Sequence, residues 1–483
     1  MKVVVAGAAG FVGRELCRTL SPDHQVTALT RQVVSDAAQG QHEPQWRQTN
    51  LFSLLDVERA LAGADVGVYL VHSMSPPSSL TQGAFEDLDL ILADNFARAA
   101  KLHGLKRIVY LGGLIPPGTL SLHLESRLEV EKVLASHGVP VVSLRAGLVI
   151  GRDGSSFRIL QKLVERLPAM VCPQWTTTRC QPIALQDVID VFVRAINDPE
   201  LKPGPYDIGG PDTLTYVDMM RQVAAAMNKR RLFLNVPFVS PALSRLWVST
   251  VTHTPKALVY PLIQSLQHDM VTRDTRLQAA YGLKPIGFLD AVQQALEPAG
   301  ASLPDAAPRS SLVPQHLRAQ RHDPTVTSVQ RLPLPAGHSL SWIVSEYARW
   351  VPRMMPPIIH VDATEDGSLS FCFRPFGLRR LTVSLLELSY SRERSSLTRQ
   401  LYYLTGGALL RKKPGTAKGR LEFRCIPGKA EVMAAVLDFR PRLPWWLYKL
   451  SQAKVHLWIM RFFGRHLQSM PAVNLAKEIP SCV

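Results

Sequence analysis

The sequence has few cysteines and no long hydrophobic stretch. Its 483 residues include 6 Cys, with no C-x-x-C pair and no His cluster at metal-ligand spacing, so we expect neither a zinc site nor a disulfide framework. No window offers the roughly 18 uninterrupted apolar residues of a membrane-spanning helix, and the N-terminus lacks the features of a secretory signal. We expect a cytoplasmic protein without a metal, with peripheral attachment to the inner face of a membrane as the alternative.

Acidic residues are scarce in the C-terminal part of the chain. Residues 305–483 carry 26 Lys or Arg and 12 Asp or Glu, a net charge of +14, whereas residues 1–304 carry 29 and 27, a net charge of +2. This asymmetry suggests an anionic partner for the C-terminal part, namely a membrane surface, an acidic ligand or an acidic protein. No nucleic acid is expected, because no recognised nucleic-acid-binding motif accompanies the charge.

Short apolar strands alternate with helices over the first 300 residues. This order predicts β-α-β units around a parallel sheet, and therefore a Rossmann-type doubly wound α/β domain over residues 1–300 with its substrate side at about 151–295. The predicted strands are Lys2–Ala6, Gln25–Thr30, Val66–Val71, Arg107–Leu111 and Val141–Arg145, and the predicted helices are Arg14–Leu20, Ser53–Leu61, Leu88–His103 and Ser126–Ser136.

The amino-acid composition and the pattern of expected elements change near residue 300. Residues 301–327 are rich in Pro, Ala, Ser and Arg and are predicted to be a linker, followed by a separate basic α+β domain over 328–470 and a tail over 471–483. We expect a helix at His338–Met354, strands at Ile358–Ala363, Leu369–Pro375, Leu381–Tyr390, Leu397–Thr405, Gly419–Ile426 and Val432–Phe439, and a long terminal helix at Leu443–Gln468.

The predicted terminal helix is amphipathic. Its apolar stripe consists of Trp446, Leu450, Ala453, Leu457, Met460, Gly464 and Leu467. The opposite face carries Ser451, Lys454, Trp458, Arg461, Arg465 and Gln468. The stripe predicts a helix packed on its own sheet, while the basic face with an aromatic residue leaves contact with an anionic membrane as an alternative.

The strongest chemical motif is a glycine loop directly after the first strand. Gly7, Gly10 and Gly13 form G-x-x-G-x-x-G between an apolar strand and a helix, the arrangement that lets backbone approach a dinucleotide pyrophosphate. The second strand ends at Thr30 and Arg31 with no carboxylate beside them. Because an arginine there can pair with a 2′-phosphate, we expect NADP(H) in preference to NAD(H).

With this loop, further segments resemble the short-chain dehydrogenase/reductase superfamily, and within it the atypical YbjT-like NAD(P)-binding proteins. The resemblance covers about residues 1–285. The segments that carry it are Tyr69–Met74, Tyr110–Leu114, His123–Val130, Ser155–Phe157, Leu163–Pro168, Gln181–Ile183, Gly209–Pro211 and Ser244–Trp247.

The resemblance implies which residues bind the cofactor. The pyrophosphate would lie at Gly7, Ala9, Gly10, Phe11, Val12 and Gly13. The adenosine ribose would lie at Thr30 and Arg31, the adenine near Asn50 and Leu51, and the second ribose beside Val71 and His72. Gly112 and Gly113 stand where the superfamily usually has a catalytic serine.

The catalytic pattern departs from that of the superfamily. Ordinary members use a Tyr and a Lys four residues later, and alignment places His123 and Arg127 there instead. On one helix face, the imidazole of His123 can act as an acid or base and the guanidinium of Arg127 can bind the ribose or an oxyanion, as in a reductase with altered catalytic residues. The alternatives are a loop histidine bound to backbone and a site that has lost proton transfer. Arg145 and Arg179 are further candidates for binding an acidic group, or for a structural salt bridge to Asp187.

Two functions therefore remain open. One is an NADPH-dependent oxidoreductase acting on a hydrophobic small molecule, and the other is a non-catalytic NADP(H)-binding scaffold, assembly or sensor protein that docks on a membrane or a partner. The element order after residue 328 weakly resembles a START/SRPBCC helix-grip domain, which implies an apolar ligand between helix and sheet. The sequence leaves the oligomeric state open.

Overall fold

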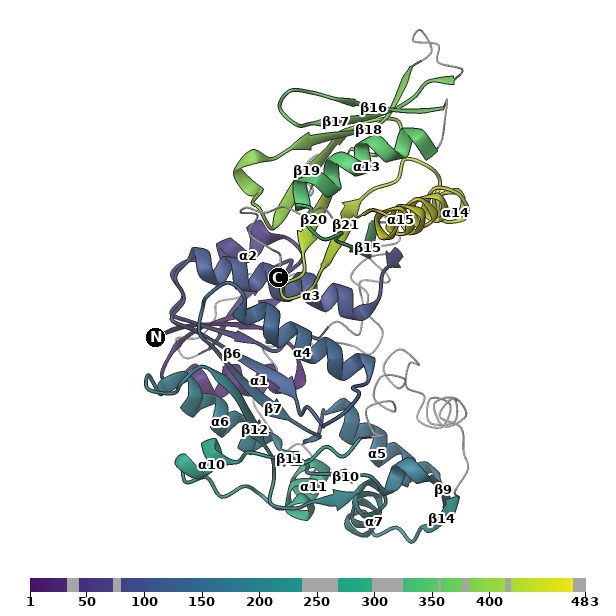
Figure 1. The fold of residues 1–483 in the computed structure, drawn as a ribbon. Helices are drawn as coiled ribbons and strands as arrows, with labels where there is room; N and C mark the ends of the chain where they lie inside the picture. Colours follow the sequence, from purple (N-terminus) through teal and green to yellow (C-terminus); the bar gives the residue numbers. More distant parts are fainter. Residues whose placement is uncertain are drawn as a thin grey trace. The chain divides into compact units, whose positions relative to one another are not determined.

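The computed structural model describes most of the chain and divides it into two compact units (Figure 1). The first unit consists of Met1–Met74 and Asp89–Arg309, and the second of Ser75–Leu88 and Ser310–Val483. The described residues are 1–32, 43–72, 80–236, 268–297, 325–354, 358–375, 382–412 and 418–471. Ser73, Met74, the segment 244–247, and most of the predicted linker and tail lie outside them.

A seven-stranded parallel sheet forms the centre of the first unit, in the order β12-β7-β6-β4-β1-β2-β3. The strands are β1 (Lys2–Ala6), β2 (Gln25–Thr30), β3 (Gln45–Gln48), β4 (Val66–Tyr69), β6 (Arg107–Gly113), β7 (Val141–Ala146) and β12 (Gly204–Ile208). The predicted Rossmann-type sheet is confirmed, and β3 and β12 are its two edge strands, which the sequence analysis missed.

Helices cover both faces of this sheet (Figure 1). α1 and α6 pack on one face, and α3 and α4 lie over the other. Their bounds, with that of the short α2, are α1 (Phe11–Leu20), α2 (Leu54–Leu61), α3 (Phe85–Leu102), α4 (Leu122–Ala135) and α6 (Leu185–Asn197). β2 pairs with β1 on one side and β4 pairs with β1 on the other, so the strand order reverses at β1. In sheets of this type, ligands bind in the crevice at the carboxyl ends of the strands where the order reverses, here β1 and β4.

Beyond the main sheet, a second apolar cluster completes the first unit. It includes the buried Phe157, Val164, Val223 and Val292. The helices that supply them are α5 (Ser155–Arg166), α7 (Tyr216–Ala226) and α11 (Phe288–Leu296), and α10 (Arg276–Ala280) packs against β12. The two-stranded sheets are formed by β8 (Val149–Ile150) with β11 (Ile183–Ala184), β9 (Ala169–Pro173) with β14 (Leu232–Val236), and β10 (Arg179–Cys180) with β13 (Leu214–Thr215).

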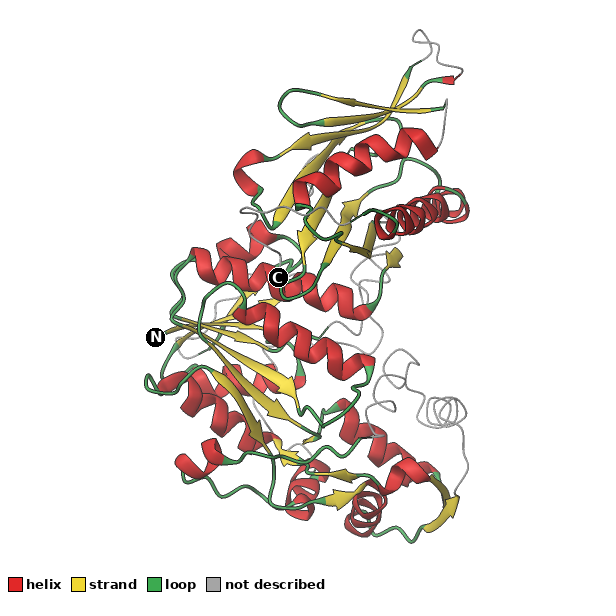
Figure 2. Ribbon diagram, in the orientation of Figure 1, coloured by secondary structure: helices red, strands yellow, loops and turns green. Residues whose placement is uncertain are grey.

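The second unit is an α+β domain built on an eight-stranded sheet, in the order β16-β17-β18-β19-β20-β21-β15-β5. The six predicted strands form an antiparallel meander: β16 (Ile359–Ala363), β17 (Leu369–Phe373), β18 (Val383–Tyr390), β19 (Arg399–Gly406), β20 (Arg420–Cys425) and β21 (Glu431–Phe439). Two helices, α13 (Leu340–Met354) and α15 (Gln452–Gln468), pack on one face of this sheet, as Figure 2 shows.

Two strands of this sheet were not predicted. β15 (Val326–Pro333) begins inside the expected linker and pairs antiparallel with β21. β5 (Leu80–Gln82) comes from far earlier in the chain and pairs in parallel with β15. Gln82 also donates a hydrogen bond from its amide nitrogen to the Ala453 carbonyl, at 3.1 Å. A three-residue strand has too few positions to show an alternating pattern, so only the pairing defines β5.

The terminal helix is interrupted, which corrects the predicted apolar stripe. α14 (Trp445–Leu450) ends at Ser451, whose non-helical φ of −117° and ψ of −87° separate it from α15. Ala453, Met460 and Leu467 are buried as predicted, but Trp446 and Leu450 have exposed fractions of 64% and 62%. The break changes the helical register, so the two halves of the stripe no longer share one face.

None of the helices in the described ranges is long and apolar enough to cross a membrane.

The thiols of four cysteines are free and buried: Cys17, Cys172, Cys180 and Cys372. Cys425 is disulfide-bonded.

The core of the second unit gives the first testable prediction. Phe463 on α15 is fully buried, with its ring centroid 5.0 Å from that of Tyr347 and 5.3 Å from that of Trp350. We expect Phe463→Ala to lower the free energy of unfolding of this unit by about 3–5 kcal/mol, because the substitution removes apolar contacts and leaves a cavity. Urea unfolding followed by circular dichroism measures the change.

Trp446→Ala is the matched control, since it removes a larger ring from a solvent-exposed position. It should change the free energy of unfolding by no more than about 0.5 kcal/mol. Equal losses for the two variants would contradict the packing described for α15.

Candidate functional site

The glycine loop brings three backbone segments into direct contact. Gly7 follows β1 with φ +87°, a conformation that favours glycine, and its carbonyl accepts a hydrogen bond from the Gly10 amide at 2.9 Å. A Cβ added at Gly13 would lie 2.3 Å from the Gly7 carbonyl oxygen, and one at Gly7 would lie 2.9 Å from the backbone of Leu70. The loop therefore fits closely between α1 and the segment that leaves β4.

The first turn of α1 provides the features that a pyrophosphate needs. Its N-cap residue, Gly10, has no side chain to occupy the first amides, and the first turn contains no acidic residue. Helix N-termini of this kind bind phosphate through free N–H groups and the positive end of the helix dipole. Phe11 packs against Gly151, where a Cβ would lie 2.6 Å from its ring, and Arg14 donates from Nε to the Ala9 carbonyl at 3.1 Å. Val12 packs against the core cluster of the sheet.

The residues expected at the adenosine end follow β2 and β3. Thr30 is buried and accepts a hydrogen bond from the Gln32 amide at 3.2 Å, whereas Arg31 is exposed. Asn50 Oδ1 accepts a hydrogen bond from the Phe52 amide at 3.1 Å, so one lone pair of the expected adenine contact is already used. The Leu51 carbonyl accepts a hydrogen bond from Asn95 Nδ2 at 2.8 Å.

At the other end of the crevice, four polar side chains meet. His72 lies three residues after β4, and its Nδ1 is 2.7 Å from Oδ2 of Asp89 on α3. The His72 ring centroid is 5.0 Å from that of His123 on α4. α4 begins at Leu122, after a cap in which Ser121 Oγ accepts from the Leu124 amide at 3.4 Å, so His123 and Arg127 lie one turn apart on one helix face.

Burial and positive charge keep both histidines of this cluster neutral. Burial lowers the pKa of His123 to about 3, and the positive charge of Arg127 acts in the same direction. Burial also lowers the pKa of His72, although the hydrogen bond to Asp89 opposes the shift. At neutral pH the cluster therefore combines a buried carboxylate, two neutral imidazoles and one permanently charged guanidinium.

Arg127 is held in place by its surroundings while part of its guanidinium remains available. Nη2 donates to the Leu111 carbonyl at 2.5 Å, and the guanidinium carbon lies 5.4 Å from the ring centroid of Tyr110. Among the described residues, no hydrogen-bond partner reaches the buried Nη1 atom. A buried donor of this kind requires a partner, such as an ordered water or a bound oxygen atom.

Gly112 on β6 lines the same region. A Cβ there would lie 3.1 Å from the ring of Tyr110, so the position that usually carries the superfamily's serine has little room for a side chain. Val71, the remaining expected cofactor contact, is half-buried beside His72.

The two other arginines considered for binding an acidic group are both engaged elsewhere. Arg145 forms a bidentate pair with Glu131, at 3.0 and 2.7 Å. The more exposed Arg179 pairs with Asp269 at 2.8 Å. The predicted bridge to Asp187 is wrong, because that carboxylate instead accepts the Ile286 amide at 2.9 Å.

Asp89 is the site residue that the sequence analysis missed. Its side chain has an exposed fraction of 1%, in a helix whose neighbouring positions Leu88, Leu90 and Ile91 are also buried. An acidic residue inside an apolar helical segment is a usable signal, because a buried carboxylate requires a partner. The sequence does not reveal which partner it has.

Comparison with known proteins finds a matching family for the N-terminal region. Residues 7–162 match the family model described as NAD(P)H-binding. The auxiliary protein GraX of Staphylococcus aureus is 28% identical over 142 residues, which are 29% of this chain and 42% of that protein. The chain thus spans less than half the length of this curated relative. Residues 7–162 are thus similar to NAD(P)H-binding domains.

Solved structures are similar to this chain only at low sequence identity. The NADPH-dependent quinone oxidoreductase QOR2 of Escherichia coli, complexed with NADPH, has a TM-score of 0.49 and 17% identity, covering 62% of this chain and 100% of its own. The triphenylmethane reductase of Citrobacter sp. has a TM-score of 0.49 and 17% identity, covering 61% and 100%. At these values neither bears on the chemistry of this chain.

The histidine cluster predicts how stability depends on pH. The folded-state pKa of His123, about 3, lies below its value of 6.5 in the unfolded chain, so the unfolded state binds the proton first as the pH falls. Stability is therefore complete above pH 6.5 and is lost toward pH 3, by up to roughly 2 kcal/mol at pH 5 at 1.36 kcal/mol per pKa unit. Urea unfolding of the N-terminal unit at pH 7, 6 and 5 measures this loss.

His123→Gln removes the titrating group and retains a polar side chain. We expect its free energy of unfolding to fall less steeply between pH 7 and pH 5 than that of the parent protein. Identical slopes for the two proteins would show that His123 titrates normally in the folded state.

Proposed function

We propose that the protein is an NAD(P)H-dependent oxidoreductase acting on a hydrophobic small molecule. The observation that supports this most directly is the Asp89–His72–His123–Arg127 cluster. Its His72 lies two residues after Leu70, whose backbone is close to Gly7 of the glycine loop. The cluster places groups able to hold and exchange a proton beside the nucleotide loop. Tyr110, whose ring centroid lies 5.4 Å from the Arg127 guanidinium carbon, and the neighbouring Tyr69 are fully buried. The cluster therefore borders an apolar core, and the substrate that we propose for it is hydrophobic.

The cofactor, when bound, supplies or accepts the hydride. His72 is the residue to which we assign proton transfer, because Asp89 fixes one ring nitrogen at 2.7 Å and so orients the ring. With its proton on Nδ1, the neutral ring exchanges protons through Nε2. In the oxidising direction it accepts a proton, and the resulting imidazolium is stabilised by the Asp89 carboxylate. In the reducing direction the ring first takes up a proton from solvent at Nε2, and the resulting imidazolium gives that proton to the substrate oxygen.

His123 and Arg127 have different roles in this proposal. With a pKa of about 3, His123 carries no proton to donate as an acid at neutral pH, so it acts as a neutral hydrogen-bonding ring beside His72. Arg127 keeps its positive charge, and its buried Nη1 atom can hold a ribose hydroxyl or stabilise negative charge on the substrate oxygen. The acid–base role that the sequence analysis gave to His123 is therefore assigned to His72 in this proposal.

Substitutions of His72 and Asp89 test this chemistry. We expect His72→Asn to lower kcat about 10²–10⁴-fold, the usual contribution of a general acid or base, with KM nearly unchanged. Asp89→Asn should lower kcat less and shift the acid limb of its pH profile. The assay follows NADPH oxidation across a panel of quinones, enones and lipid-like aldehydes.

A second His–Asp pair in the same unit provides the control. His137 Nε2 lies 2.8 Å from Asp94 Oδ1, outside the cluster, so His137→Asn should leave turnover at the parent rate. Retained NADPH-dependent thermal stabilisation shows that each variant still binds the cofactor. Full turnover in His72→Asn would refute the proton-transfer role, and stabilisation by NADPH without turnover on any substrate would favour a non-catalytic binding protein.

The preference for NADP(H) rests on Arg31, which is exposed at the carboxyl end of β2. A guanidinium there can form charge-assisted hydrogen bonds to the 2′-phosphate. We expect Arg31→Asp to weaken NADPH binding at least about tenfold and to leave NADH binding equal or stronger, because hydrogen bonds to charged groups contribute about 1.5–3 kcal/mol. Titration calorimetry with each nucleotide measures the ratio, and an unchanged ratio would remove Arg31 from the cofactor site.

A further inference from the structure

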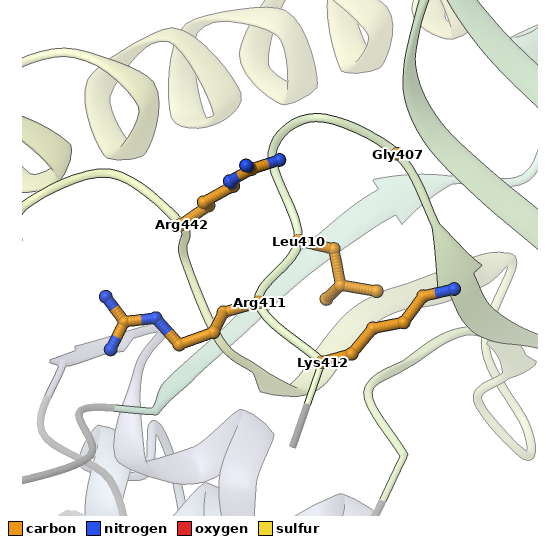
Figure 3. Close-up of a pocket in the computed structure, with 5 residues that line it drawn as sticks. All are labelled: Gly407, Leu410, Arg411, Lys412 and Arg442. Carbon is orange, nitrogen blue, oxygen red and sulfur yellow. The ribbon is translucent and has the colours of Figure 1, made fainter. Parts of the chain in front are cut away.

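A basic hollow lies on the surface of the second unit (Figure 3). It has a volume of about 500 Å³ and is lined by Gly407, Leu410, Arg411, Lys412 and Arg442. None of these five described residues is acidic. The three basic side chains are exposed, and within the described part of the chain no carboxylate pairs with them.

Backbone pairing holds the two sides of this basic hollow together. The Arg411 amide donates to the Arg440 carbonyl at 2.9 Å, and the Arg442 amide donates to the Leu409 carbonyl at 3.0 Å. Two segments about thirty residues apart thereby run side by side, and their cationic side chains extend from this backbone in different directions (Figure 3). Guanidinium and ammonium donors on neighbouring backbone segments, with no acid among them, suit a phosphate-bearing anion.

Large apolar side chains project into solvent immediately after the hollow. The exposed fractions are 64% for Trp446, 62% for Leu450, 44% for Val455 and 45% for Trp458. Trp446 follows Arg442 by four residues, so their Cα atoms lie within about 14 Å of each other. Single exposed apolar residues are common, but four of this size within α14 and the start of α15 form a feature that needs a partner.

The charges interleaved with these side chains have a single sign. Lys449, Lys454, Arg461 and Arg465 are exposed along α14 and α15. No Asp or Glu occurs between Arg440 and Pro471. Lys454, Trp458, Arg461 and Arg465 recur at steps of three and four, so they share one face of α15, opposite the buried Ala453, Met460 and Phe463.

From these observations we propose that the second unit docks on an anionic lipid bilayer. The basic hollow binds a lipid phosphate, Trp446, Leu450 and Trp458 enter the interfacial region, and the exposed cations contact further headgroups. Indole rings are suited to this position because they combine an apolar body with a polar N–H. A bilayer is favoured over an acidic protein because protein interfaces are depleted in lysine, whereas basic amphipathic helices with exposed Trp and Leu are typical of membrane surfaces.

Vesicle binding of the full chain tests this proposal. We expect co-sedimentation with vesicles of 70% phosphatidylcholine and 30% phosphatidylglycerol, weak binding to pure phosphatidylcholine, and loss of binding as NaCl rises because the attraction is screened. Each basic residue near an anionic surface contributes about fivefold to partitioning. The triple variant Arg411→Glu/Lys412→Glu/Arg442→Glu should therefore bind at least about 100-fold more weakly.

A matched triple variant distinguishes the effect of the charges at the hollow from the effect of the protein's net charge. Lys202→Glu/Arg273→Glu/Lys284→Glu changes the total charge equally, but at exposed positions of the first unit, and should retain vesicle binding within about threefold. Trp446→Ser/Leu450→Ser should weaken binding and abolish part of the blue shift of tryptophan fluorescence. Circular dichroism and NADPH-dependent thermal stabilisation confirm that the variants fold.

Three results would overturn the proposal. These are equal binding to neutral and anionic vesicles, equal losses in the two triple variants, and unchanged binding when the hollow's charges are reversed. Binding to an acidic polypeptide such as poly-glutamate, without binding to anionic vesicles, would assign the surface to a protein partner instead.

Discussion

Close backbone contact at the glycine loop is the constraint on which the rest of the first unit depends. The Gly7 carbonyl lies where a Cβ of Gly13 would have to be, and Gly7 itself touches the backbone of Leu70. These contacts bring the start of α1 and the exit of β4 together at the centre of the parallel sheet. The free amides of α1 and the polar groups after β4 therefore face one crevice, because the strand order reverses there.

Burial then determines the chemistry of the groups in that crevice. A histidine near neutral pH is normally divided between two protonation states, but desolvation and the charge of Arg127 keep His72 and His123 neutral. Asp89 compensates by orienting one of the two rings. In the function we propose, His72 is the proton-exchanging group and Arg127 is the cation beside it.

The second unit shows how one local break changes the role of a helix. Without the interruption at Ser451, Trp446 and Leu450 would continue the stripe that packs on the sheet. With it, α15 keeps Met460 and Phe463 in the core, while Trp446 and Leu450 of α14 face solvent. The same segment therefore serves both packing and a surface whose charges have one sign.

The sequence determined the elements whose pattern is local: the parallel strands, the glycine loop, the antiparallel meander and the basic character of the C-terminal part. Periodicity and glycine spacing encode these directly. Only the tertiary structure decided that β5 joins a sheet more than two hundred residues away, that Asp89 meets His72, and that Arg145 pairs with Glu131. Such partners depend on which surfaces are brought together by packing, and a side chain's neighbours across space leave no period along the chain.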